Sequence, residues 1–125
     1  MNNNISLHRA LPDLSLLISQ SDLAFGATGV TTWERMCLGL PSIVITIADN
    51  QVPAATALHN DGLITYLGCD HEVTIQSVQE AITSKMADKG ALKQESERIK
   101  CFVDGCGASR VVDKIYSTGL SISAK

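Results

Sequence analysis

Short apolar runs that alternate with amphipathic stretches constrain the fold of this chain more than any other feature. The clearest run, at residues 42–47, reads SIVITI, and β-branched residues of this kind favour a strand. Amphipathic stretches lie before and after it, and such alternation is typical of a parallel sheet with crossover helices. We therefore predict an α/β fold with a parallel sheet of about four strands and C-terminal helices.

The same patterns locate the expected elements along the chain. The last helix should carry its apolar residues, Val111, Val112, Ile115 and Tyr116, on an inner side. A helix over 74–87 should place Ile75, Val78, Ile82 and Met86 on one stripe. The predicted strands are 5–10, 21–26, 42–47 and 63–68, and the predicted helices are 12–20, 31–40, 53–60, 74–87, 91–103 and 107–117.

Length and charge limit the classes of function. A chain of 125 residues can form one modest core, so we expect a single domain over residues 1–125. The net charge of -3, without any basic block, argues against a nucleic-acid partner, because such affinity comes mainly from clustered Lys and Arg. No apolar run reaches the roughly 18 residues that cross a bilayer, and the N-terminus lacks a secretory signal. A cytoplasmic protein without a membrane partner is expected.

The cysteines predict neither a disulfide framework nor a metal site. They show no Cys-x-x-Cys pair and no companion histidine spacing. Free thiols are therefore expected in a reducing compartment, with no metal and no cofactor. The four are Cys37, Cys69, Cys101 and Cys106.

A glycine–threonine turn at residues 26–34 permits two interpretations. In the first, Thr31 and Glu34 form a capping box that satisfies the free amides of the following helix, while Gly26 and Gly29 provide backbone angles that other residues resist. In the second, those amides and the hydroxyls of nearby threonines bind a phosphate at the helix N-terminus. The turn lacks both the Walker lysine and the dinucleotide glycine spacing.

A second polar loop favours the phosphate interpretation. Residues 48–55, ADNQVPAA, follow the next predicted strand and open the next helix. Asp49 or Asn50 could cap that helix, with Pro53 just inside it. Because the carboxyl ends of parallel strands meet at one edge of the sheet, where α/β proteins bind ligands, the two loops are expected to share a pocket.

Together these segments resemble a known family. The run GATGVTTWERMCLGLPSIVITIADNQ and the tail DGCGASRVVDKI at 104–115 are similar to the C-terminal portion of the UDP-sugar hydrolases of pseudaminic acid biosynthesis. The related spore-coat polysaccharide proteins share these features, and MurG-like N-acetylglucosaminyltransferases resemble them more distantly. The resemblance spans about residues 5–117. It implies a Rossmann-like, three-layer domain from a two-domain, GT-B-like architecture.

The resemblance also implies roles for particular residues. The turn would hold the diphosphate of UDP, Glu34 would take the ribose hydroxyls, and Asn50 and Gln51 would lie near the sugar or phosphates. The implied function is the UDP-sugar-binding portion of a hydrolase in nonulosonic (pseudaminic) acid or surface polysaccharide biosynthesis. Two alternatives stay open: a non-catalytic binding or interaction module, and a fragment of a MurG-like glycosyltransferase. The candidate substrate-binding residues are Thr28, Gly29, Thr31, Thr32, Glu34, Asn50 and Gln51.

The chain departs from the family pattern in ways that affect these expectations. Thr28 and Val30 replace a usual glycine and serine, and Asp49 replaces a usual glutamate. The family's N-terminal half, with its catalytic histidine, has no counterpart here, so the chain alone is expected to be inactive and no catalytic residue is assigned. The histidines, His8, His59 and His71, do not match that motif.

The beginning of the family's C-terminal half, which normally supplies two strands and a glycine-rich turn, also has no counterpart here. The resemblance would place those two strands between residues 5–10 and 21–26, so their absence raises a question about the edge of the sheet. Either residues 5–10 dock beside the strand at 21–26, which gives four strands, or an edge stays open. Exposed edges pair with other chains, so self-association, or pairing with the missing half, is expected.

Four side chains near these motifs have mainly structural interpretations. Arg35 is expected to be solvated, and the single tryptophan, Trp33, to pack rather than to stack on a ligand. Arg110 is expected to hold the turn at Asp104 by hydrogen bonding or an ion pair.

Overall fold

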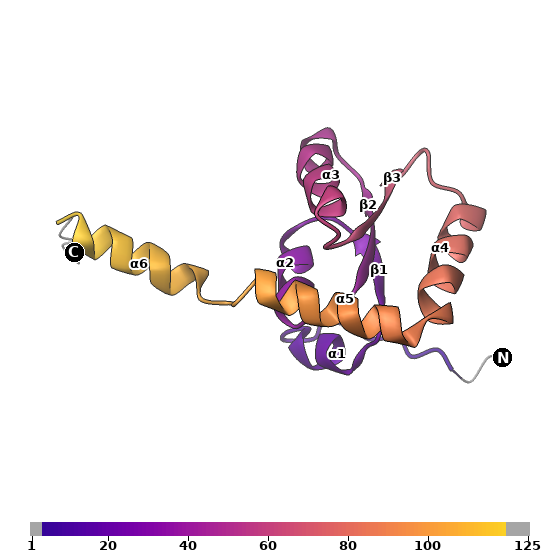
Figure 1. Cartoon of the computed structure of the whole chain (residues 1–125), viewed down its shortest axis with the longest axis horizontal. Helices are drawn as coiled ribbons and strands as arrows, with labels where there is room; N and C mark the ends of the chain where they lie inside the picture. The colour runs from indigo at the N-terminus through magenta and orange to yellow at the C-terminus, as the bar shows by residue number, and fades with distance from the viewer. Residues whose placement is uncertain (1–3, 120–125) are drawn as a thin grey trace.

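Three parallel strands form the sheet of this chain. The structure, a computed structural model, describes residues 4–119. Strands β1 (Ala24–Ala27), β2 (Ser42–Thr46) and β3 (Thr65–Cys69) lie in the order β1-β2-β3 (Figure 1). Helix α2 (Val30–Cys37) connects the first pair of strands, and helix α3 (Val52–Asn60) connects the second. The predicted α/β fold with a parallel, Rossmann-like sheet is confirmed, with three strands rather than about four.

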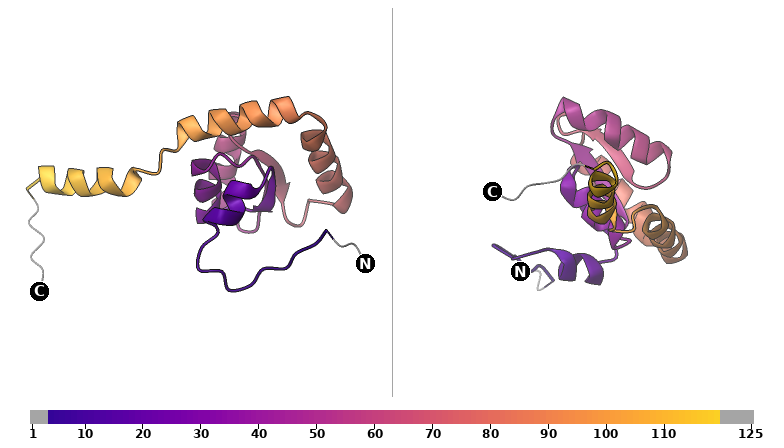
Figure 2. Two further views of the ribbon diagram at one scale, coloured as in Figure 1. Left: turned by 90° about the horizontal axis from the view of Figure 1, so that it is seen from below. Right: turned by 90° about the vertical axis from the view of Figure 1, so that its left-hand side faces the viewer.

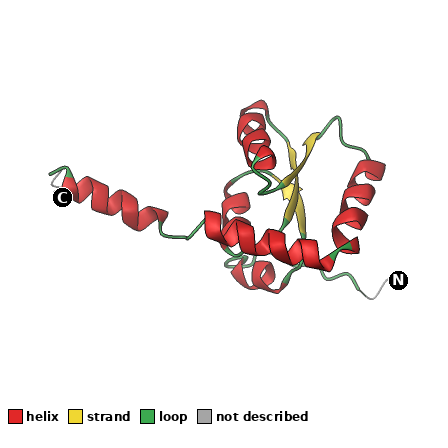
Figure 3. Ribbon diagram, viewed as in Figure 1, coloured by secondary structure: helices red, strands yellow, loops and turns green. Residues whose placement is uncertain are grey.

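Helices cover the sheet on both sides. Helices α2 and α3 lie against one face, and α4 (Ile75–Ala87) lies on the other side (Figure 3). Helix α5 (Lys89–Phe102) runs from α4 back to α2, which it contacts. The short helix α1 (Ser15–Gln20) precedes β1. This layered arrangement is the one that parallel strands with crossover connections require.

The core lies between the sheet and helices α2, α3 and α5. Strand side chains alternate between the two faces, so Val44 of β2 faces this core while Ile43 and Ile45 face the side of α4. Ile99 of α5 is fully buried in the same cluster. The cluster is aliphatic, as the low aromatic content requires: Met36, Val44, Ala55, Leu58, Leu63, Ile64 and Ile99.

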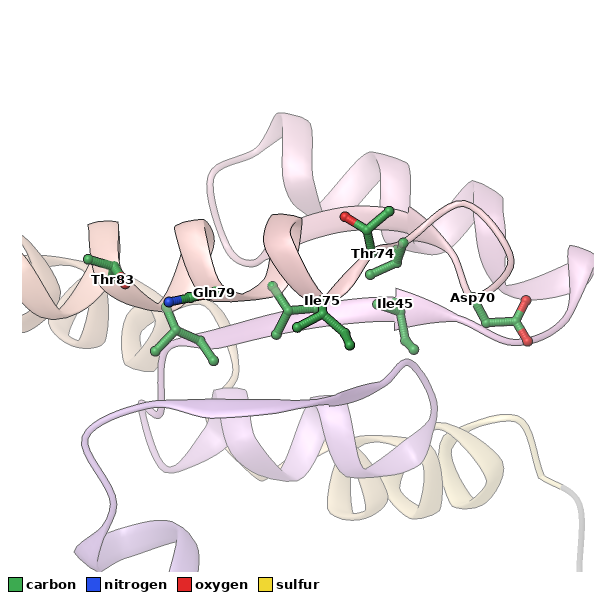
Figure 4. A pocket seen from close by; sticks show the side chains of 9 residues that line it. Ile45, Asp70, Thr74, Ile75, Gln79 and Thr83 are labelled. Carbon is green, nitrogen blue, oxygen red and sulfur yellow. The ribbon is translucent and has the colours of Figure 1, made fainter.

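Helix α4 covers its side of the sheet incompletely. An apolar groove of about 600 Å³ separates it from β2, with Ile45 on the strand side and Ile75 on the helix side (Figure 4). The predicted stripe therefore remains partly open, because Ile75 is 89% exposed and Met86 is 51% exposed. An ion pair between Lys85 and Glu95 attaches α4 to α5.

The predicted strand at residues 5–10 is wrong. These residues form no strand, and Ile5 and Leu7 are largely exposed. Ala10 has a φ of 51°, which an extended strand cannot contain. In the described part of the sheet, β1 pairs only with β2, so its other edge stays open.

The predicted packing of the last helix is also wrong. Helix α6 (Gly107–Ser117) projects away from the rest of the structure (Figure 2). Its apolar side chains do not face inward, since Val111 and Tyr116 are 60% and 69% exposed. The connection from α5 turns at Gly105, whose φ is +75°, and leads the helix outward. The amphipathic pattern predicted the helix correctly, but the apolar side of the helix packs against no other described element.

Two further observations concern membranes and disulfides. Within residues 4–119, no helix is both long and apolar enough to cross a bilayer. All four cysteines lie in this range and are free thiols.

Candidate functional site

Two loops meet at the carboxyl edge of β1 and β2, and the pocket that the sequence predicted between them stays a prediction. Gln51 joins them. Its amide nitrogen donates to the Thr28 carbonyl at 2.9 Å, and its amide oxygen accepts from the Ile47 N–H at 2.9 Å. The Thr28 hydroxyl lies 3.2 Å from the same oxygen. The Gln51 side chain thus holds the β1–α2 turn and the β2–α3 loop together. Because these contacts use its amide group, the side chain points toward the protein.

The start of α2 does not contain the predicted capping box of Thr31 and Glu34. The helix begins one residue earlier, at Val30, and its N-cap is Gly29, which has no side chain to offer. Instead, the Gly29 N–H donates to the hydroxyl of Thr32 at 3.2 Å, and the Thr32 N–H donates to the Gly29 carbonyl at 3.0 Å. A box requires a side-chain acceptor at the N-cap, and glycine cannot supply one.

Two backbone amides at this helix end are therefore free. Among the described residues, nothing accepts a hydrogen bond from the N–H of Val30 or Thr31. Val30 is 76% exposed, so solvent reaches the first residue of the helix. Free N–H groups and the positive end of the helix dipole both favour an anion at such a position.

The threonine hydroxyls contribute less to this surface than the sequence suggested. Thr28 and Thr32 are buried. Thr28 faces Gln51, and the oxygen of Thr32 accepts from Gly29 and from Arg35. Of the three, only Thr31 is partly exposed with no hydrogen bond to its hydroxyl among the residues described. Any ligand contact at this turn would depend chiefly on backbone amides.

The prediction of a solvated Arg35 is wrong. Its side chain is 6% exposed and lies beneath the turn, where one terminal nitrogen, Nη2, is 3.2 Å from the Ala27 carbonyl and 3.2 Å from the Thr32 hydroxyl. Burial lowers the pKa of the guanidinium. Thr32, Arg35 and Met36 are the buried residues of α2, and their spacing is that of an inward helical face.

Gly26 makes room for this arginine. A Cβ atom at Gly26 would lie 3.0 Å from the Nη1 atom of Arg35. The backbone at Gly26 and Gly29 does not need glycine for its angles. Gly26 has no positive φ, and Gly29, at 164°, is extended. Space, rather than conformational freedom, explains the glycine on β1.

Glu34 and Trp33 lie on the outer side of α2 beside a cavity of about 410 Å³. Trp33 is 46% exposed, so the predicted packing role is only partly met. The Glu34 carboxylate is exposed and, in the described region, pairs with no other side chain. Helix α1 and Val103 complete the cavity. The carboxylate therefore remains available to a ligand one turn from the free amides.

Asn50 and Asp49 line the outer part of the second loop. They belong to the short 3₁₀ helix η1 (Asp49–Gln51), whose N-cap is Ala48. Neither side chain caps this segment or α3, and both are exposed. The predicted cap at this loop is wrong, whereas Pro53 does occupy the first turn of α3.

Other titratable groups lie elsewhere. The His59 ring nitrogen Nδ1 accepts from the Tyr66 N–H at 3.3 Å and so supports β3. His71 stands beside Asp70 at the end of β3. Over residues 4–119, no three His, Cys, Asp or Glu side chains are grouped so that they could hold a metal ion. The predicted tie of Arg110 to Asp104 is confirmed by contacts of 2.7 and 3.0 Å.

Sequence comparison with known proteins finds two relatives. Over 113 residues, 90% of this chain, it is 30% identical to the NDP-glycosyltransferase YjiC of Bacillus subtilis (strain 168), of which it matches 28%. Over 99 residues, 79% of this chain, it is 25% identical to the spore coat polysaccharide biosynthesis protein SpsG of the same organism, of which it matches 29%. The chain thus spans less than a third of the length of these curated relatives.

The two matches support a relationship to glycosyltransferase-like proteins, which agrees with the Rossmann-like sheet. They do not single out the pseudaminic acid hydrolases. No protein-family model matches the chain, and no solved structure gives a significant match.

Proposed function

We propose that this chain binds the diphosphate of a nucleotide sugar, with UDP as the nucleotide. The free N–H groups of Val30 and Thr31 at the exposed start of α2 carry this proposal. They lie at the carboxyl edge of a parallel sheet, the usual position of ligands in such folds. Both relatives carry names from sugar chemistry, an NDP-glycosyltransferase and a polysaccharide biosynthesis protein, which supports a nucleotide-sugar ligand over other anions.

The proposed ligand extends along α2. The diphosphate accepts hydrogen bonds from the free N–H groups of Val30 and Thr31 and from the Thr31 hydroxyl, while Gly29 and Thr32 form the turn that holds these amides in place. The ribose hydroxyls donate to Glu34, and the sugar lies toward Asn50. Thr28 and Gln51 shape the site from below, since their polar groups already bond to each other. We propose that residues 1–125 act as one Rossmann-like nucleotide-sugar-binding unit.

We propose hydrolysis of a UDP-sugar, in nonulosonic acid or surface polysaccharide biosynthesis, as the reaction that this unit serves. Water would attack the anomeric carbon, and UDP would leave with the electrons of the broken bond. The general base would come from another polypeptide segment, so the chain alone should release no UDP. Glycosyl transfer is the second candidate, and the 30% identity to a glycosyltransferase favours it. A non-catalytic binding module is the third.

Titration of UDP into ¹⁵N-labelled protein tests the proposed binding. We expect selective amide shifts at Gly29, Thr31, Thr32 and Glu34, saturating at millimolar UDP, and smaller shifts with pyrophosphate. Uridine, which lacks the phosphates, should not move the first three. If millimolar UDP moves none of them, the proposal is overturned.

A variant separates ribose binding from phosphate binding. E34Q should weaken UDP binding by about tenfold or more, because a hydrogen bond to a charged acceptor contributes about 1.5–3 kcal/mol. Pyrophosphate binding should stay unchanged. E97Q, which removes an exposed carboxylate from α5, is the matched control and should alter neither.

A further inference from the structure

We propose that Arg35 is a positioning residue for the anion site on α2, and that its buried positive charge is balanced by the bound phosphate. This inference rests on the proposed function and deepens it. In this role Arg35 holds residues 29–31 in their binding geometry without touching the ligand.

The hydrogen bonds of Arg35 lead directly to the turn. Its Nη2 atom is 3.2 Å from the carbonyl of Ala27, the last residue of β1, and 3.2 Å from the hydroxyl of Thr32. That hydroxyl also accepts from the N–H of Gly29 at 3.2 Å. One guanidinium thus connects the end of the strand, the N-cap and the first helical turn. The free amides of α2 lie between these fixed points.

Among residues 4–119, no ion pair compensates the charge of Arg35, and the neighbouring Glu34 carboxylate offsets it only in part, since burial still lowers the pKa of the guanidinium. Within the range the structure describes, its two acceptors are neutral oxygens and no carboxylate forms an ion pair with it. Its Nε atom is buried and has no hydrogen-bond partner. Burying an unpaired charge is costly, and a neutral side chain could support Ala27 and Thr32 by itself. A phosphate at the free amides, separated from the guanidinium by the Thr32 hydroxyl, would balance that charge.

Gly26 shows that the fold accommodates this guanidinium closely. A Cβ at that position would lie 3.0 Å from Nη1, so the absence of a side chain on β1 leaves the space that the arginine fills. The position of the charge is therefore fixed by packing on one side and by two hydrogen bonds on the other.

Two substitutions distinguish charge from hydrogen bonding. R35K keeps the charge and loses the planar fork, whereas R35Q keeps a donor and loses the charge. We expect pyrophosphate, followed by ¹⁵N amide shifts, to bind R35Q about tenfold or more weakly and R35K within about threefold of the unchanged protein. A buried positive charge attracts an anion without touching it, and only R35Q loses that charge. Without ligand, R35Q should unfold at an unchanged or higher urea concentration.

Arg98 provides the matched control. It also donates to a backbone carbonyl, that of Gly62, through two nitrogens at 3.2 and 2.7 Å, but it is exposed and lies on α5. R98Q should leave pyrophosphate affinity unchanged.

A measurement on the unchanged protein keeps the inference testable if R35Q does not fold. The Nε–H signal of Arg35 should shift on saturation with pyrophosphate, whereas that of Arg98 should not. Equal affinities for R35Q and R35K, or a motionless Arg35 signal in protein that binds pyrophosphate, would overturn this inference and leave the proposed function intact. Failure of the unchanged protein to bind either pyrophosphate or UDP would overturn both.

Discussion

Gly26 in β1 and Gly29 at the start of α2 are glycines for different physical reasons. Gly26 faces the guanidinium of Arg35, with 3.0 Å between a Cβ and Nη1, whereas a Cβ at Gly29 would meet no atom within 4 Å. Gly29 also stands at the N-cap, where it leaves the amides of the first turn uncapped. Gly26 therefore leaves space for the Arg35 side chain, and Gly29 leaves the amides of the first turn accessible.

We expect G26A to lower the free energy of unfolding by about 1–3 kcal/mol, the usual cost of overpacking a filled site. We expect G29S to keep or raise it by a few tenths of a kcal/mol, because serine is a better N-cap than glycine. The new hydroxyl would accept from the amides that an anion needs, so pyrophosphate affinity should fall. Urea denaturation and pyrophosphate titration of both variants check this pair. A G29S protein that binds as tightly as the unchanged one would contradict the proposed use of the amides.

Gln51 is the second residue whose contribution the structure isolates. Its side chain joins the two loops through contacts to Thr28 and Ile47. Each such hydrogen bond contributes about 0.5–1.5 kcal/mol, so we expect Q51A to lower the free energy of unfolding by about 2 kcal/mol in urea denaturation. N50A, which removes an exposed neighbour, should change it by less than about 0.5 kcal/mol. Equal effects would show that the connection between the loops lies elsewhere.

At the scale of elements, the sequence predicted most helices and strands within a few residues. A β-branched run marked β2, and the turn at Asp61 and Gly62 marked the start of the segment that contains β3. Gly39, with a φ of +72°, ends α2 as its position before Pro41 indicated. The prediction failed for residues 5–10, where an alternation of apolar and polar residues had no neighbouring strand to pair with. A strand depends on a partner, so its pattern alone is weaker evidence than that of a helix.

The start of α6 depends on a titratable contact. The Arg110 guanidinium, and then the Cys106 N–H, hold the pKa of Asp104 at about 2, below its ordinary value of 3.8. Because the folded pKa is the lower one, the stabilising contribution is complete above about pH 4 and is lost as the pH falls through about 2. Acid should therefore release this turn only below about pH 3.

Carboxyl ¹³C NMR measures this directly. We expect the Asp104 resonance to titrate near pH 2 and to move toward its ordinary value in R110Q. K114Q, which removes another cation of α6, should leave the midpoint in place. An unchanged midpoint in R110Q would show that Arg110 does not lower this pKa.

At the scale of the whole molecule, several surfaces lack a partner in the described chain. The outer edge of β1 is unpaired, and Phe25 on this strand is 46% exposed. Strand β1 contains no lysine or proline, although natural sheets commonly use these residues to prevent an edge strand from pairing with another chain. The apolar side of α6 and the groove beside α4 add to this unpartnered surface.

We therefore expect the chain to self-associate as its concentration rises, as a mass increase in light scattering. F25K places a charge beside the open strand and should reduce this association. L16K, which introduces the same charge at an exposed position of α1, is the control. A monomer at every concentration would contradict the expectation, and a stronger effect of L16K would place the contact on α1.

The sequence by itself determined the order of the elements and brought two polar loops to one edge of the sheet. These features depend on local periodicity and on the fixed geometry of parallel strands, which neighbouring residues encode. Only the tertiary structure decided which side chains face inward at that edge. Arg35 is buried because Gly26, nine residues earlier, leaves space for it, and Gln51 bonds to Thr28 across 23 positions of sequence. Packing between elements determines such contacts. The amides of the first turn of α2 stay free because the side chains of Arg35 and Gln51 form their hydrogen bonds beneath that turn.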